Sequence, residues 1–224
     1  DFFQKKDLPV FFSKHYFNLK KTLLEEENVG KDRLFEKMAL AKKNAFYLKR
    51  QEKSKVISSR ILDFKSNLDL FYLKERLRLA CLEINYKEIF GEPVNSITQN
   101  NLISEFENEI KANSVLSFYH QFLTLNANFD TNLLISMVNN FIDSFEKFLP
   151  LEQKTITVLI LNKIFQSFRF GHSSLLPLAM KVNDLALKEK LLEENGYLPS
   201  ITFINIATTA IAVNQFDWAK NFIH

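Results

Sequence analysis

Apolar residues recur along most of this chain at spacings of three and four, which is the periodicity of an amphipathic α-helix. No segment alternates convincingly with the period of two that is typical of a β-strand. The pattern is clearest in residues 67–90, where charged side chains such as Lys74 are expected to point away from one apolar face. That face consists of Leu70, Leu73, Leu77, Ala80 and Ile84.

Helix-breaking residues are rare and fall mainly at the ends of the predicted helices. The 224 residues contain only four Gly and five Pro, so long segments are free to form helices. Pro177 falls inside a predicted segment, but within its first turns, where proline is tolerated. The predicted helices cover residues 9–28, 32–52, 54–65, 67–90, 97–112, 114–126, 130–148, 151–170, 173–194, 200–213 and 215–224.

A helix-hairpin pattern recurs with a spacing of 43 residues over positions 114–224. Asn128, Gly171 and Asn214 share one column, and both residue types tolerate the left-handed conformation that ends a helix. We therefore expect a bend between two helices at each of them. Apolar residues align around these bends, in the columns Phe118/Leu161/Ile204, Leu125/Phe168/Ile211, Leu133/Leu176/Ala219 and Met137/Met180/Ile223. The first two columns are predicted to be buried.

This repeat predicts an all-α fold, a right-handed α-α superhelix of antiparallel helix hairpins. Residues 67–224 would form the stacked hairpins, and residues 1–66 an irregular, basic helical segment. Stacked helical repeats usually bind other molecules rather than transform them. A Phe content of 23 residues is expected to fill the helical core, since aromatic residues at helical spacing are usually packing.

The last unit, residues 200–224, resembles a tetratricopeptide-type repeat. Phe203 and Ala207 stand for the bulky and small residues of its first helix, and Phe216 and Ala219 for the aromatic residue and alanine of its second. The period of 43 instead of 34 is equally compatible with armadillo-like or HEAT-like helix pairs. The resemblance therefore implies helix-hairpin packing and specifies no ligand.

The resemblance also suggests a binding surface. In peptide-binding tetratricopeptide proteins, an asparagine on the first helix of a unit can hold a ligand backbone in the concave groove, and Asn162 and Asn205 occupy matching positions. Equally, both amides could tie neighbouring helices together. The candidate partner-binding residues are Asn162, Asn205, Gln166, Arg169, Tyr119 and His120.

Charge favours a second class of partner. Residues 1–90 carry 20 Lys and Arg against 13 Asp and Glu, whereas residues 91–224 carry 9 against 13. A basic patch could track the phosphates of a nucleic acid, although a solvated helix face is the simpler interpretation. This patch comprises Lys42, Lys43, Lys49, Arg50, Lys53 and Lys55.

The sequence contains no recognisable catalytic motif. The four histidines are dispersed, no second ligand stands at metal-binding spacing, and no glycine-rich loop could hold a phosphate. We therefore expect no enzymatic activity, cofactor or metal, although an enzyme or small-molecule binder stays a third alternative. The single Cys81 is expected to be a small buried hydrophobe, which favours a reducing, cytoplasmic location. No signal peptide and no membrane-spanning segment is expected.

The chain ends in an apolar turn. Trp218, Phe222 and Ile223 lie on one side of the last predicted helix, without a polar capping helix after them. The expectation is that the chain is part of a longer solenoid, in which case these side chains are partly exposed or covered by a second copy. The main functional hypothesis is a protein-protein interaction scaffold.

Overall fold

The computed structural model describes residues 39–40, 54–92 and 106–223, and nearly all of these residues are helical. No strand occurs among them, and Glu194 and Tyr197 form only an isolated bridge. The predicted all-α class is therefore confirmed for the described residues. The helices predicted over residues 9–28 and 32–52 lie almost entirely outside them.

The described residues divide into two compact units, one with residues 39–40, 54–79 and 106–117 and the other with residues 80–92 and 118–223. Helix α4, Ser54–Phe90, contributes to both units. The first unit also holds the short helix α6, Glu107–Ala112. The second contains most of α7 and, after it, α8 to α12, with bounds Ser114–Ala127, Thr131–Asp143, Pro150–Arg169, Leu176–Lys188, Ser200–Ala212 and Phe216–Ile223.

Helix α4 is continuous, so the break predicted at residue 66 is wrong. Ser66 and Asn67 are weak helix formers, but neither Gly nor Pro interrupts this stretch, and their small propensity cost does not end a long helix. Four residues of the predicted apolar face are buried, and Leu70 is partly buried. Lys74 is also fully buried, against expectation, because the covered stripe of the helix is wider and continues through Cys81 and Asn85.

Short polar residues and prolines begin several helices. The side chain of Asn113 accepts hydrogen bonds from the backbone N–H groups of Val115 and Leu116, and Asp130 accepts one from the N–H of Asn132. Pro150 opens α9, and Pro177 lies in the first turn of α10, as predicted. These residues fix where the helices begin.

Two of the three predicted left-handed bends are confirmed. Gly171 has φ +96° between α9 and α10, and Asn214 has φ 61° between α11 and α12. Asn128 is not left-handed. The chain turns there through Asn128 and Phe129 into the cap of α8, so no left-handed residue is needed.

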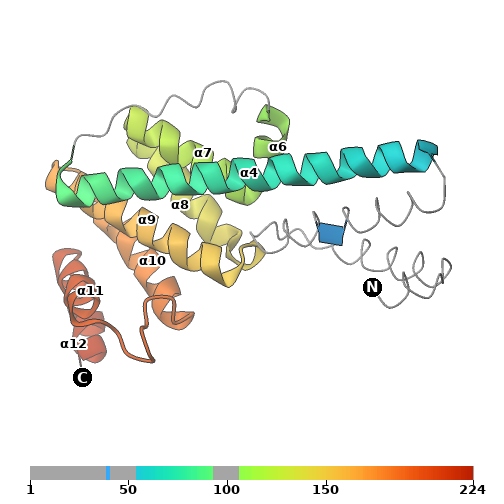
Figure 1. Cartoon of the computed structure of the whole chain (residues 1–224). Helices are drawn as coiled ribbons and strands as arrows, with labels where there is room; N and C mark the ends of the chain where they lie inside the picture. The colour runs from blue at the N-terminus through green and yellow to red at the C-terminus, as the bar shows by residue number, and fades with distance from the viewer. Residues whose placement is uncertain (1–38, 41–53, 93–105, 224) are drawn as a thin grey trace. The chain divides into compact units, whose positions relative to one another are not determined.

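The helices of the second unit pack mainly against neighbours in sequence. Helix α10 contacts α8, α9 and α11, and α11 pairs with α12 (Figure 1). Between α7 and α8 the core is aromatic, and Phe141 lies at its centre. Its ring contacts those of Phe118, Phe145 and Phe148 at centroid distances of 6.2, 5.6 and 5.3 Å. Phenylalanine thus fills this core, as expected.

The six column positions do not share one environment. Phe118, Leu161 and Leu125 are buried as predicted, whereas Phe168, Ile204 and Ile211 are 43%, 52% and 48% exposed. Helix α11 is covered by α10 and α12 on one side only, and its opposite face carries Ile204 and Ile211. Phe168 lies on the side of α9 that lines an open groove between α9 and α11.

The turns that follow α7 and α9 lie side by side. Phe129 follows α7 and His172 follows α9, 43 residues later, and their rings lie 5.0 Å apart between centroids. The turns after α7 and α9 are therefore adjacent. Among the described residues, no helix is long and apolar enough to cross a membrane.

Cys81 is fully buried, as predicted, and its thiol donates to the backbone oxygen of Tyr119 at 3.4 Å. Burial raises the pKa of this thiol well above its ordinary value, because the thiolate would lose its hydration. We expect native protein to react with an aromatic disulfide reagent about a hundredfold more slowly than urea-unfolded protein. Absorbance of the released thiol measures both rates. Equal rates would show that this part of α4 opens freely.

Candidate functional site

A groove of about 760 Å³ runs between α9 and α11 in the second unit, with the last turns of α4 at its side. Its floor is partly apolar, with Phe165 and Phe168 from α9 and Ile201 from α11. The polar groups that line it come from three helices: Asn85 and Glu88 of α4, Asn162, Gln166 and Arg169 of α9, and Asn205, Thr208 and Thr209 of α11.

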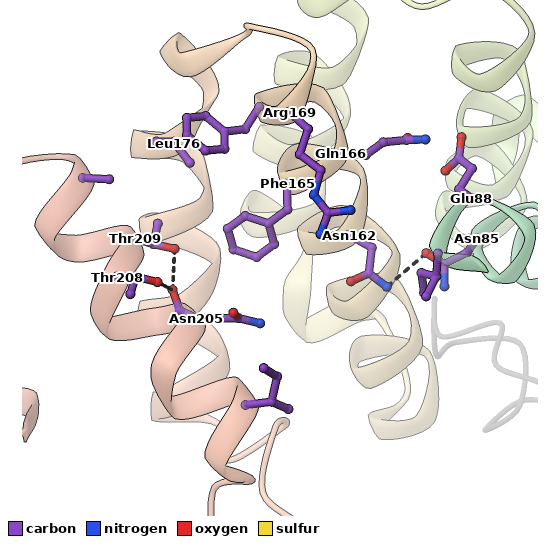
Figure 2. A pocket seen from close by; sticks show the side chains of 14 residues that line it. Asn85, Glu88, Asn162, Phe165, Gln166, Arg169, Leu176, Asn205, Thr208 and Thr209 are labelled. Carbon is purple, nitrogen blue, oxygen red and sulfur yellow. Dashed lines mark hydrogen bonds between the residues drawn. The ribbon is translucent and has the colours of Figure 1, made fainter. Parts of the chain in front are cut away.

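Side-chain amides occupy both walls of this groove (Figure 2). Asn162 donates through Nδ2 to Oδ1 of Asn85 at 3.0 Å, which ties α9 to α4. Asn205 points from α11 toward α9 and is exposed. Both threonine hydroxyls donate to backbone oxygens of α11, so they are already engaged. Asn205 is thus the amide available to an incoming molecule, and Asn162 holds the wall.

Lys163 forms a buried ionic network beside the groove. It is 6% exposed, and its Nζ donates to Glu88 at 2.8 Å, to Asn126 at 2.5 Å and to Gln166 at 2.9 Å. These partners belong to α4, α7 and α9, so one ammonium group connects three helices. Because Lys163 neutralises Glu88, the charge of Glu88 is not free to attract a cation into the groove.

Arg169 supplies the remaining charge of the groove. Its side chain is exposed and runs along α9 toward Asn162 (Figure 2). Arginine presents five N–H donors in a fixed planar arrangement that matches a carboxylate or phosphate. The groove therefore combines an apolar floor, open amide donors and acceptors, and one cation that no carboxylate among its lining residues neutralises.

Four of the six predicted partner-binding residues line the groove: Asn162, Gln166, Arg169 and Asn205. Tyr119 does not, because it is fully buried and its hydroxyl donates to the buried carboxylate of Glu152. His120 is half-buried and likewise lies outside the lining residues. Tyr119 thus joins α7 to α9 in the core, where a partner cannot reach it.

Several residues of this site carry no signal in the sequence. Asn85 and Glu88 lie on α4, 77 and 75 residues before the α9 side chains that they contact. Neither belongs to a motif, and one turn of an amphipathic helix does not reveal its distant neighbour. A search for polar residues at the end of the longest predicted helix would have included them, together with many irrelevant positions.

The groove lacks the groups that begin most enzymatic reactions. Among the described residues that line it there is no histidine, cysteine, serine, lysine or tyrosine, and Glu88 is its one carboxylate. No cluster of three metal-binding side chains occurs in the described part of the chain. The polar groups of three helices do converge here, so a small molecule could be bound, but the lining holds no paired acid and base, and the Thr208 and Thr209 hydroxyls donate to backbone oxygens.

Two further surfaces were predicted, a basic patch and an apolar C-terminal turn. The basic patch at Lys42, Lys43, Lys49, Arg50 and Lys53 lies outside the described residues, as does the side chain of Lys55. At the end of α12, Phe222 stacks between Phe203 and Trp218 at 4.9 and 5.0 Å. As expected, Trp218 and Phe222 are partly exposed and Ile223 is exposed.

Comparison of the chain with protein-family models, with curated proteins and with solved structures finds no match. The resemblance of residues 200–224 to a tetratricopeptide unit therefore stays a prediction.

Proposed function

We propose that this chain is a non-catalytic interaction module and that the groove between α9 and α11 binds an extended segment of a partner protein. The observation that carries the proposal is the composition of the groove: an apolar floor, side-chain amides on both walls, and an exposed arginine. An extended peptide presents unpaired backbone N–H and C=O groups every residue. Amide side chains can both donate to and accept from such groups.

The architecture that we propose for this module is a right-handed α-α superhelix of hairpins α7–α8, α9–α10 and α11–α12. The contact between Phe129 and His172 supports it, because residues one period apart meet in space. So does the packing of α10 between α8 and α11. In such a stack the first helices of successive hairpins line one surface, which is where the groove lies.

Within this site Asn205 and Arg169 are proposed to contact the partner. Both are exposed, and the Asn205 amide points across the groove. Asn162 is instead a positioning residue, because its amide donates to Asn85 and thereby holds the wall of α4 against α9. The two asparagines that the sequence placed in equivalent positions thus have different roles.

Selection of a displayed random-peptide library against the whole chain tests the proposal. We expect enriched peptides whose affinity, measured by fluorescence polarisation, falls about tenfold with Asn205→Ala and at least as much with Arg169→Glu, since each removes a central polar contact. Asn139→Ala on α8 and Lys181→Glu on α10 are matched controls, because both sites are exposed and outside the groove lining. Neither control should change the affinity.

Two outcomes would overturn the proposal. One is that no enriched peptide depends on Asn205 or Arg169. The other is that a screen of small metabolites by thermal shift finds a compound whose stabilisation disappears in Arg169→Glu, while no peptide binds the groove. The second result would assign the site to a small-molecule ligand.

A further inference from the structure

A second hollow, of about 280 Å³, opens beside the groove at the turns of two successive hairpins. It is lined by Phe129, Lys163, Gln166, Ser167, Phe170 and His172. We call it the aromatic pocket, because three of these six residues carry rings. Gln166 lines both the groove and the pocket, so the two spaces adjoin along the last turns of α9.

The walls of the aromatic pocket are partly fixed. Phe129 and His172 support each other through their ring contact, and Gly171, with φ +96°, lets the chain reverse so that His172 reaches Phe129. Phe170, directly before that glycine, is 77% exposed. The ring of Phe170 therefore exposes apolar surface to water beside the cavity. A side chain bound in the cavity would cover that surface.

The charges next to the pocket favour one sign of ligand. Lys163 is among the lining residues, but Glu88, Asn126 and Gln166 already engage its ammonium group. Arg169 precedes Phe170 in the chain. The one carboxylate that lines the groove with it belongs to Glu88, and Lys163 already neutralises that carboxylate. The combined site therefore carries one excess positive charge, and its complement is an acidic group.

We infer that the partner segment combines an acidic residue with a nearby aromatic or bulky aliphatic residue. The carboxylate pairs with Arg169, and the bulky side chain enters the aromatic pocket. This inference rests on the function proposed above and specifies the ligand of the same site. The pocket lies just below the range of about 300–1,000 Å³ that whole small-molecule sites occupy, so one side chain is the fitting occupant.

The two halves of the site contribute in different ways. A buried aromatic anchor in a pocket is the kind of contact that dominates peptide affinity, whereas an exposed charge pair gains less and is weakened by salt. The bulky side chain should thus add affinity that salt does not weaken. The acidic residue should set the register of the segment in the groove and its preference for low salt.

Parallel selections of the peptide library test this division. Against the unaltered chain, enriched peptides should share an acidic and a bulky apolar residue at a fixed spacing. Against Phe170→Ala the bulky preference should vanish while the acidic preference stays, and against Arg169→Glu the reverse should hold. For a synthetic consensus peptide, Phe170→Ala should weaken binding about tenfold.

Phe216→Ala is the matched control, because Phe216 is 59% exposed on α12 and lines neither space. Circular dichroism checks that each variant is folded, and Phe129→Ala probes the opposite wall independently. Peptides that require Arg169 or Asn205 but show no bulky preference would overturn this inference and leave the proposed function standing. Absence of any groove-dependent peptide would overturn both. A dimer seen by light scattering and lost in Phe170→Ala would assign the pocket to a second copy of the chain.

Discussion

Replacing Lys163 with methionine is expected to lower the free energy of unfolding by about 3 kcal/mol. Methionine keeps most of the aliphatic stem, so the change removes chiefly the ammonium group. Glu88, with 17% of its side chain exposed, would then lie in the protein without its cation, and Asn126 and Gln166 would lose a donor. Urea unfolding followed by circular dichroism measures the loss.

Two further variants give this prediction its control. Lys154→Met makes the same chemical change on an exposed position of α9 and should cost less than about 0.5 kcal/mol. Adding Glu88→Gln to Lys163→Met removes the stranded charge and should restore part of the stability. Equal stability of Lys163→Met and Lys154→Met would contradict the assignment of the network as a structural connection.

Phe141→Ala is expected to cost about 4 kcal/mol, because it deletes a ring that is 1% exposed at the centre of the aromatic core. The lost ring leaves a cavity between α7 and α8 and removes the contacts with Phe118, Phe145 and Phe148. The midpoint of urea unfolding should fall accordingly. Phe141→Leu keeps more of the volume and should cost less.

The exposed Phe90, on the last turn of α4, supplies the comparison. Phe90→Ala removes the same atoms from a side chain that is 73% exposed, so no cavity forms and the stability should change little. A cost at Phe141 as small as that at Phe90 would mean that the aromatic core is not closely packed. The peptide affinity of Phe141→Ala, measured where the variant is still folded, should be unchanged.

The proposed role of Lys163 links stability to binding. Glu88 and Gln166 line the groove and are both held by this ammonium group, so its loss would free two side chains of the binding surface. Asn205 and Arg169 lie apart from the network. Variants of the network should accordingly lower both the free energy of unfolding and the peptide affinity, whereas variants of Asn205 and Arg169 should lower the affinity alone.

The helices themselves were determined by local chemistry, and the sequence was sufficient to predict them. Periodicity located α7, α9, α10 and α11 to within a few residues of most of their ends, and Gly171 and Asn214 turn where a left-handed residue was expected. Each of these features depends on residues within one or two turns of one another. Helix bounds and left-handed turns depend on residues close together in the chain, so they can be predicted from the sequence alone.

Which apolar face is covered was decided only by the tertiary structure. Helix α11 carries apolar residues on several sides, so periodicity could not show that Ile204 and Ile211 face outward while Ile206 and Ala210 are buried. The same holds for Tyr119 and Asn162, whose partners Glu152 and Asn85 are far away in the chain. The sequence alignment predicted equivalent positions for Asn162 and Asn205, yet Asn162 hydrogen-bonds to Asn85 of α4 whereas Asn205 is exposed. Contacts between distant segments depend on how helices pack, and that packing separates a structural asparagine from one that is open to a partner.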